Sequence, residues 1–472
     1  MKSSTVSNKK QISYDEFLSY VTKDKRILSI LNYYGLITED DLREDFNGAT
    51  EEKQLPDCDS DLEDEVKLEH YSSNENKIQL KKPLLQAALR QAPKNFKPSK
   101  TDEEPPDATL ELEFVYGYKS CNVRNNLRYT RTGRIVYHTA SVGIVYNPQE
   151  TKQQYFFEHK NNISCLAIHP NLIFVATGEI SESPYIFIWD TTTMECLTCL
   201  YGVLKKGICH LAFSEGGKYL AAIGADYFHS IAIYNWEAYK NNEEGLIASG
   251  QVSSTSLLSL VFNPKGNIIA APGIQEVNFI SYTNNIIQVH KGIGWGFNKK
   301  QTMLCGVYLD DDFITGSFSG EIVIWADGRL TKITEAHKGM VYAICRREAG
   351  RGIITGGSDG IVIVWNSELI KDVVINIADN KALNCYVPKV RSVCEGAEGN
   401  ILVGVRSGEI IEINQNKVRV LLRSHYKGEL KGLAIHPKQP KFITFGEDGV
   451  LFDWSINAKR ACRVLLMFIV VC

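Results

Sequence analysis

Short apolar segments with β-type character recur along the chain about every 40 to 48 residues, and this repeat restricts the fold more than any other feature. The copies have alternating large apolar residues and mostly end in an aromatic residue followed by a polar one. They are VGIVYN (142–147), IFIWD (186–190), IAIYN (231–235), VNFIS (277–281), IVIWA (322–326), IVIVWN (361–366), EIIEIN (409–414) and LFDWS (451–455). A second apolar segment and a Gly-rich turn precede most copies, as in IITGGSDG (353–360). The pattern therefore predicts a protein assembled from β-units of one kind.

The period is that of a four-stranded blade, and a strand, a Ser-Asp-Gly turn and a strand ending in Trp resemble a WD40-type blade. In that family a buried His, a Ser or Thr, an Asp and a Trp form a hydrogen-bonded network within one blade. Two complete sets match it: His337, Thr355, Asp359 and Trp365, then His425, Thr444, Asp448 and Trp454. His159 and Trp189 are similarly spaced, whereas Ser319 stands where Asp is expected. We predict an all-β propeller of about seven blades with a small α-helical N-terminal segment, in which these networks are structural.

Composition changes divide the chain into five predicted regions. Residues 1–48 have helical spacing, and residues 49–108 form an acidic and Pro-rich linker that is expected to be largely disordered. Residues 109–147 lead into the propeller, and residues 148–456 contain the repeats. Residues 457–472 are predicted to be an apolar tail that could begin a truncated further blade.

The charge excludes some partner classes. The 472 residues have a formal net charge of −3, so the chain is not a polycation that coats nucleic acid. Residues 1–108 hold 16 Lys and Arg against 22 Asp and Glu, a net charge of −6, and the remainder has +3. The terminal LLMFIVVC is about half as long as a membrane-spanning helix. We expect no nucleic-acid or membrane partner.

The sequence has no convincing catalytic or cofactor motif, and we predict no enzyme activity, catalytic residue, cofactor or metal site. Gly356–Gly360 fits G-x-S-x-G, but a strand follows it where a nucleophile elbow needs a helix. Asp310, Asp311 and Asp312 are consecutive, so their carboxylates diverge, and a solvated loop is favoured over a metal site.

The N-terminus resembles the end of an EF-hand calcium loop. Ile12 and Glu16 would fill the eighth and twelfth loop positions, but Thr5, Ser7 and Lys9 occupy positions that usually supply calcium ligands. We therefore predict that calcium does not bind there. The segment is expected to be a remnant exit helix that packs onto a partner or onto a missing upstream hand.

A polar and aromatic segment introduces the repeats. It contains Val115, Tyr116, Gly117 and Tyr118, then Arg124, Asn125 and Asn126, and later IVY (135–137), ASV (140–142) and YN (146–147). In order and spacing these stretches resemble the hydrophobic HELP motif that opens the tandem propellers of the echinoderm microtubule-associated protein-like (EMAP-like) family. The segments LAIHP (166–170) and GLAIHP (432–437) are similar to repeats of the same family. The resemblance covers about residues 109 to 456.

The resemblance implies a WD40 scaffold on microtubules or the axoneme, with tubulin or axonemal proteins as partners and other proteins bound through the propeller faces. The expected location is the cytoskeleton of the cytoplasm, with the cilium as one site. Relatives usually carry a second propeller and often a coiled coil in a basic region; this N-terminal segment is acidic, and the pattern suggests a protein cut at both ends. The chain alone is therefore expected to bind microtubules weakly or not at all. The alternative is a generic WD40 adaptor in a non-cytoskeletal complex.

Overall fold

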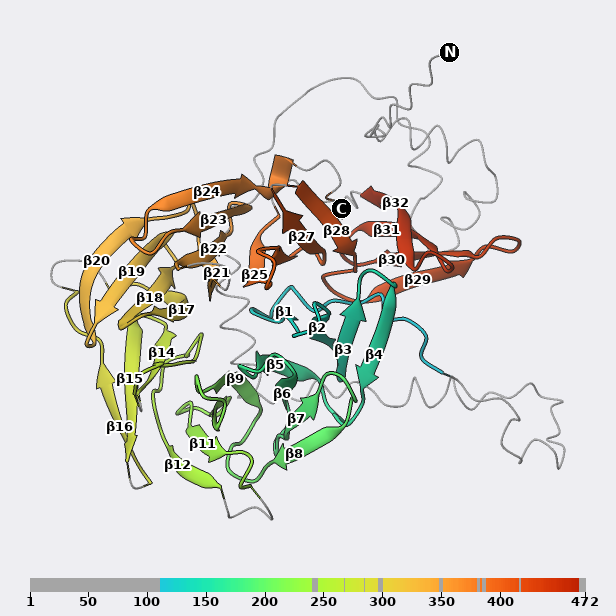
Figure 1. The fold of residues 1–472 in the computed structure, drawn as a ribbon. Coiled ribbons are helices and arrows are strands. Elements are labelled where there is room, and N and C mark those ends of the chain that lie inside the picture. The colour runs from blue at the N-terminus through green and yellow to red at the C-terminus, as the bar shows by residue number, and fades with distance from the viewer. Residues whose placement is uncertain are drawn as a thin grey trace, which may run out of the picture. The chain divides into compact units, whose positions relative to one another are not determined.

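The computed structural model describes residues 111–466, except 240–244, 267, 284, 296–299, 348–350, 380–382, 384–387 and 416. Almost all ordered structure in this part is antiparallel β, in eight sheets of four strands each. Consecutive strands pair within each sheet, so every sheet is a simple meander (Figure 1). The predicted all-β propeller fold is confirmed. The expected helical segment and linker, and the EF-hand-like remnant, lie outside the described residues.

The strands of the first four sheets follow the repeat. The first sheet contains β1 (Arg128–Tyr129), β2 (Ile135–Thr139), β3 (Val142–Asn147) and β4 (Lys152–Phe156). The second contains β5 (Ile163–Ile168), β6 (Phe174–Glu179), β7 (Ile186–Asp190) and β8 (Cys196–Leu200). The third contains β9 (Ile208–Phe213), β10 (Tyr219–Gly224), β11 (Ile231–Asn235) and β12 (Leu246–Gly250). The fourth contains β13 (Val261–Phe262), β14 (Ile268–Gly273), β15 (Glu276–Thr283) and β16 (Ile286–Lys291).

The remaining sheets have the same order. The fifth contains β17 (Met303–Leu309), β18 (Asp312–Ser317), β19 (Glu321–Ala326) and β20 (Arg329–Glu335). The sixth contains β21 (Val341–Arg346), β22 (Ile353–Gly357), β23 (Ile361–Trp365) and β24 (Lys371–Asn376), followed by the 3-10 helix η3 (Ile377–Asp379). The seventh contains β25 (Val390–Glu395), β26 (Ile401–Val405), β27 (Ile410–Asn414) and β28 (Lys417–Leu422). The eighth contains β29 (Leu430–Ile435), β30 (Lys441–Gly446), β31 (Val450–Ser455) and β32 (Arg460–Leu466).

Burial explains why some strands are continuous apolar runs and others alternate. The second and third strands of a ring sheet are covered on both faces by neighbouring sheets, and β22 is buried along its whole length. Fourth strands lie at the outer edge and alternate in exposure, as in β4. Fourth strands therefore have a weaker apolar pattern in the sequence than the buried inner strands, and the sequence repeat is most visible in the third strand.

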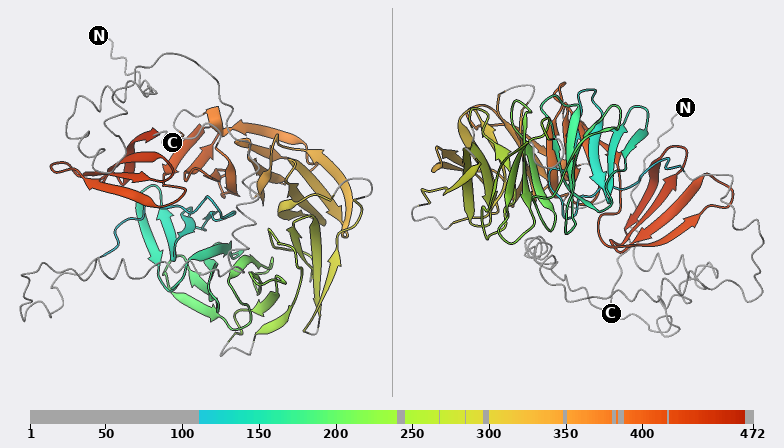
Figure 2. Two further views of the ribbon diagram at one scale, coloured as in Figure 1. Left: turned by 180° about the vertical axis from the view of Figure 1, so that it is seen from behind. Right: turned by 90° about the horizontal axis from the view of Figure 1, so that it is seen from below.

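The first seven sheets form a closed ring (Figures 1 and 2). Their first strands contact one another in succession from β5 to β25, and β25 contacts β1. Tyr118 and Leu127 pack in one cluster with Leu402 and Leu422 of the seventh sheet, which joins the two ends of the ring. The first strand of each of these seven sheets is therefore the innermost one, and these strands surround a central channel.

The eighth sheet is additional to this ring. Its Val450, Phe452 and Trp454 pack with Tyr116 and Tyr426, but all six residues of β29 are exposed. The expectation for residues 457–472 is wrong for β32, since this strand pairs with β31 and completes the eighth sheet instead of beginning another blade. Edge strands carry little periodic signal, so β32 was not recognised. Within the described residues, no helix is long and apolar enough to cross a membrane.

Candidate functional site

The sixth sheet brings together His337, Thr355, Asp359 and Trp365. His337 Nδ1 lies 3.0 Å from Asp359 Oδ1, and His337 Nε2 lies 2.9 Å from Thr355 Oγ1. Trp365 donates its indole N–H to the same threonine oxygen at 2.9 Å. The chain of bonds is satisfied when the imidazole proton is on Nδ1, because Thr355 can then donate to Nε2. The four side chains use up their own hydrogen-bonding capacity, which is the arrangement of a structural network.

Asp359 also fixes the backbone of its turn. It accepts bonds from the backbone N–H groups of Lys338 and Ile361 at 3.0 and 3.2 Å. Burial raises the pKa of the Asp359 carboxyl, but the bonds from His337 and from these two backbone groups outweigh that effect and hold the pKa below its usual value. Asp359 is therefore a carboxylate that joins the loop before β21 to the turn before β23.

The eighth sheet contains an equivalent network. His425 Nδ1 lies 3.0 Å from Asp448 Oδ1, His425 Nε2 lies 2.8 Å from Thr444 Oγ1, and Trp454 donates to Thr444 at 2.7 Å. Asp448 accepts a backbone bond from Tyr426 at 3.1 Å. The geometry of this network does not require its sheet to be part of the ring, since every partner belongs to the eighth sheet or to its loops.

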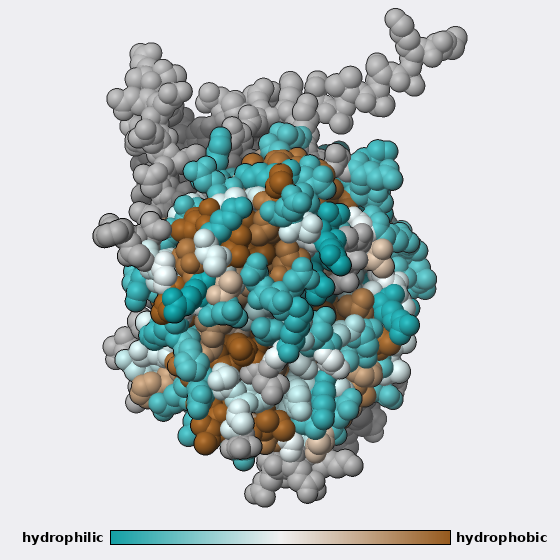
Figure 3. Space-filling model, turned by 60° about the vertical axis from the view of Figure 1, so that its left-hand side comes forward, coloured by the Kyte–Doolittle hydropathy of each residue, from teal (hydrophilic) through white to brown (hydrophobic). Residues whose placement is uncertain are grey.

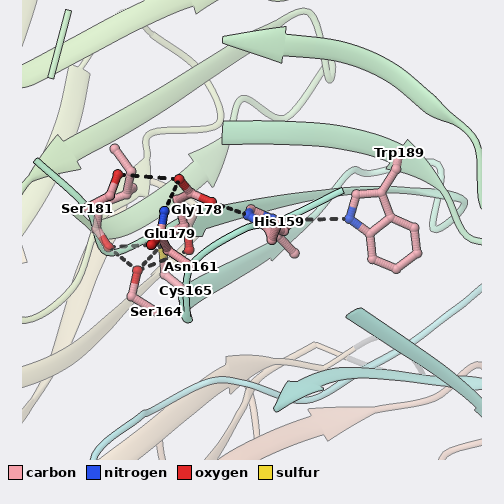
Figure 4. Close-up of polar contacts among 10 residues, drawn as sticks. His159, Asn161, Ser164, Cys165, Gly178, Glu179, Ser181 and Trp189 are labelled. Carbon is pink, nitrogen blue, oxygen red and sulfur yellow. Dashed lines mark hydrogen bonds and ion pairs between the residues drawn. The ribbon is translucent and has the colours of Figure 1, made fainter. Parts of the chain in front are cut away.

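The second sheet has a third network, whose acidic member was not predicted from the sequence (Figure 4). His159 Nδ1 lies 3.1 Å from Glu179 Oε2, His159 Nε2 lies 2.7 Å from Thr177 Oγ1, and Trp189 donates to Thr177 at 3.1 Å. Asn161 donates to the other Glu179 oxygen at 3.1 Å. Asp359 follows its threonine by four positions and Glu179 by only two. The spacing from His159 to Trp189 was a signal for this network, but the acid was expected at another position.

The fifth sheet keeps part of the pattern with different partners. Trp325 donates to Thr315 at 3.0 Å. Ser319, which stands in the position expected for Asp, donates to Gln301 at 2.6 Å, and Gln301 donates to Glu321 at 2.8 Å. A neutral amide thus replaces the histidine in linking the loop before the first strand to the turn before the third.

The first half of the HELP-type segment links blades that are distant in sequence. The backbone N–H and C=O of Val115 bond to the Gln153 side chain of β4 at 2.7 and 3.0 Å. Tyr116 contacts Trp454 of the eighth sheet with ring centroids 4.7 Å apart. After Gly117, the buried Tyr118 packs edge-on against Tyr137, with centroids 5.8 Å apart. Tyr116 and Tyr118, two positions apart, therefore pack against different sheets.

The second half crosses the channel. Arg124 donates to the Leu258 backbone oxygen at 3.2 Å, and Asn125 N–H donates to the Arg391 oxygen at 3.2 Å. The Asn126 amide donates to two backbone oxygens, those of Lys119 and His138, and its oxygen accepts from His138 N–H at 3.0 Å. This half therefore connects the first and seventh sheets with the segment that precedes β13 of the fourth sheet.

The central channel has a volume of about 1170 Å³. Cations that line it include Lys119, Arg124, Arg128, Arg131, Arg134, Lys206, Arg346 and Arg419, against the carboxylates Glu395, Glu398 and Glu412. In the part of the chain that the structure describes, no group of three His, Cys, Asp or Glu side chains is placed to hold a metal ion. Ser358 of the G-x-S-x-G match lies in the turn between strands β22 and β23. The channel chemistry favours binding of an anionic group.

Comparison with known proteins gives consistent matches. The model of the echinoderm microtubule-associated protein first beta-propeller matches residues 152–413, and the HELP motif model matches residues 105–144. Echinoderm microtubule-associated protein-like 2 of Rattus norvegicus is 29% identical over 376 residues, which cover 76% of this chain and 56% of the relative. Echinoderm microtubule-associated protein-like 1 of Mus musculus is 30% identical over 373 residues, covering 76% and 44%. The 77 kDa echinoderm microtubule-associated protein of Strongylocentrotus purpuratus is 28% identical over 371 residues, covering 75% and 52%. The chain spans about half the length of the curated relatives it matches.

Proposed function

The chain belongs to the echinoderm microtubule-associated protein family, and we propose that it is a non-enzymatic scaffold that holds other proteins on microtubules or on the axoneme. The observation that carries the proposal is the family match across 152–413, since this range spans most of the ring. The family resemblance inferred from the HELP-type segment is confirmed. The proposed location is the cytoskeleton of the cytoplasm and, in ciliated cells, the axoneme.

The architecture supports a scaffold. Seven sheets expose loops at two mouths of the ring, so several partners have separate surfaces on which to bind. The buried networks of the second and sixth sheets are internally satisfied and hold these loops in place. A rigid ring with exposed loops suits binding more than chemistry.

The same features predict that a single copy binds microtubules weakly. Residues 109–472 have a net charge of +3, a weak attraction for the acidic tubulin surface, and residues 1–108 have −6. Exposed charges are screened beyond about 8 Å at physiological salt. Linking two weak sites raises the apparent affinity by about 10²–10⁴-fold without new contacts.

Pelleting with stabilised microtubules tests the proposal. The purified chain should pellet at low salt and be released at physiological salt, whereas the chain fused to a dimeric coiled coil should remain bound. The coiled coil fused to an unrelated protein is the control. If neither form pellets at low salt, the microtubule proposal is wrong, and an adaptor role in a non-cytoskeletal complex is favoured. Tight binding of the single chain at physiological salt would instead contradict the weak-binding expectation.

A further inference from the structure

We infer that one mouth of the ring is a binding site for an extended acidic peptide of a partner protein, one that also carries an aromatic or large apolar side chain. The site combines exposed apolar side chains on three loops with cations at the adjoining end of the channel. The inference goes beyond the proposed function, because it names a site and the chemistry of its ligand.

The apolar part consists of five exposed side chains on the loops after β6, β8 and β10. We call it the aromatic surface, and it contains Ile180, Tyr185, Tyr201, Tyr227 and Phe228. The rings of Tyr185 and Tyr201 lie 5.5 Å apart, and those of Tyr227 and Phe228 lie 5.0 Å apart. Tyr227 is 72% exposed. Aromatic side chains are enriched among residues that dominate binding energy at protein interfaces.

The three loops form one continuous surface. Lys206 N–H donates to the Glu182 oxygen at 3.3 Å, and Ala225 N–H donates to the Gly207 oxygen at 2.9 Å. Asp226 accepts from the Phe228 backbone N–H at 3.2 Å, which fixes the tip of the third loop. These bonds hold in place the loops that carry the aromatic side chains before a ligand arrives, so less conformational entropy is lost on binding.

Single apolar side chains exposed elsewhere on the ring do not form a comparable surface. The side of the molecule in Figure 3 shows apolar patches among hydrophilic side chains, and exposed apolar side chains are by themselves ordinary on a protein surface. What distinguishes the aromatic surface is the contact between its rings and the direct hydrogen bonds between its loops. Ile180 also lines the channel, so the surface continues into that cavity.

The direction of the strands separates the charges in the channel. Every innermost strand is the first of its sheet, so all of them run through the ring in the same direction. Lys206 lies just before β9, at the mouth where these strands begin. Glu395 ends β25 and Glu398 follows it, so both lie toward the opposite mouth, together with Arg346 at the end of β21 and with Arg131 and Arg134 between β1 and β2. The opposite mouth thus has charges of both signs, whereas Lys206 is a cation beside the aromatic surface, and we expect an acidic peptide to bind at the mouth that carries this surface.

Lys119 adds a cation at the same mouth. Its Nζ lies 3.4 Å from the backbone oxygen of Ile163, the first residue of β5. Burial lowers the pKa of Lys119, and a carboxylate beside it would restore the stability of the charged ammonium. Outside the channel, Glu158 and Glu182 on the surrounding loops offset the charge of the exposed Lys205. The acidic part of the peptide is thus expected in the channel, with its apolar residues on the aromatic surface.

Fluorescence anisotropy with a labelled synthetic peptide tests the inference, using Glu-Glu-Phe repeats as the probe. Wild-type protein should bind it, and Tyr227→Ser with Phe228→Ser should weaken binding at least about tenfold. Lys206→Glu should weaken it similarly and reduce the salt dependence. The matched controls are Ile286→Ser on β16 and Lys332→Glu on β20, exposed residues on outer strands, which should bind normally.

Two control peptides test whether binding needs both the acidic and the aromatic residues of the probe. A peptide with Gln in place of Glu, and one with Ser in place of Phe, should both bind weakly. The inference is overturned if wild type does not bind the probe, if the Gln peptide binds equally well, or if the control variants lose as much affinity as the site variants. Thermal unfolding midpoints identify any misfolded variant, and Tyr227→Ser alone then replaces the double change.

Discussion

Leu166 and Leu433 lie at the same position of an identical pentapeptide, LAIHP, yet Leu166 is 7% exposed and Leu433 is 62% exposed. Leu166 packs with Val136 and Val145 of the first sheet. Leu433 borders an open groove of about 300 Å³ lined by apolar side chains such as Phe114. The neighbouring sheet, and not the local sequence, decides how much apolar surface the leucine buries.

This pair gives a matched stability test. Leu166→Ala should reduce the free energy of unfolding by about 2–4 kcal/mol, because it leaves a cavity between two sheets. Leu433→Ala should change it by about 0.5 kcal/mol or less, because its side chain already contacts solvent. Denaturant unfolding measures both. Equal losses would contradict the structure and would mean that another surface covers Leu433 in solution.

Removing the carboxylate of the sixth-sheet network should destabilise the ring. Asp359→Ala leaves His337 and two backbone N–H groups without their acceptor, and we expect a loss of about 1–3 kcal/mol. A lower midpoint of thermal unfolding is the readout. Asp311→Ala is the control, since it removes only an exposed ion pair with Lys265 and should cost about 1 kcal/mol or less. An unchanged midpoint for Asp359→Ala would argue against its structural role.

The second-sheet network should depend on side-chain length. Glu179 reaches His159 from a position two residues after Thr177, so Glu179→Asp withdraws the carboxylate by about 1.5 Å, one carbon–carbon bond. We expect a loss of about 1–3 kcal/mol in thermal unfolding, although the charge is retained. Glu182→Asp on the exposed neighbouring loop is the control. Wild-type stability in Glu179→Asp would show that the network tolerates a shorter acid.

Glu276 should contribute to stability in acid. Burial raises the pKa of its carboxyl, but bonds from Lys291, Ser253, Thr255 and Asn278 outweigh this and lower the pKa from 4.5 to about 2. A group whose pKa is depressed by folding stabilises the protein above its unfolded value and loses that contribution as pH falls toward its folded value. Stability should therefore fall between pH 4.5 and about 2. Glu276→Gln should have a smaller dependence in that range; an identical pH profile would refute the assignment.

Features that depend on short separations along the chain could be predicted from the sequence. Blade period, strand type and the two networks built on Asp359 and Asp448 were visible, because all four members of each network lie within one repeat. The HELP-type segment was recognisable as a motif for the same reason. Its contacts were not, since Arg124 reaches Leu258 and Ser424 bonds to the Tyr118 oxygen.

The three-dimensional structure was needed to show which surfaces are buried and which charged side chains come together. It placed the first sheet against the seventh, left the eighth sheet outside the ring, and brought Glu179 to His159 through a side chain long enough to replace the expected acid. It also gathered Tyr185, Tyr201 and Tyr227 on one mouth. Packing between sheets joins residues that are far apart in the chain, so a period of one blade has no information about which sheet covers another or which loops share a face.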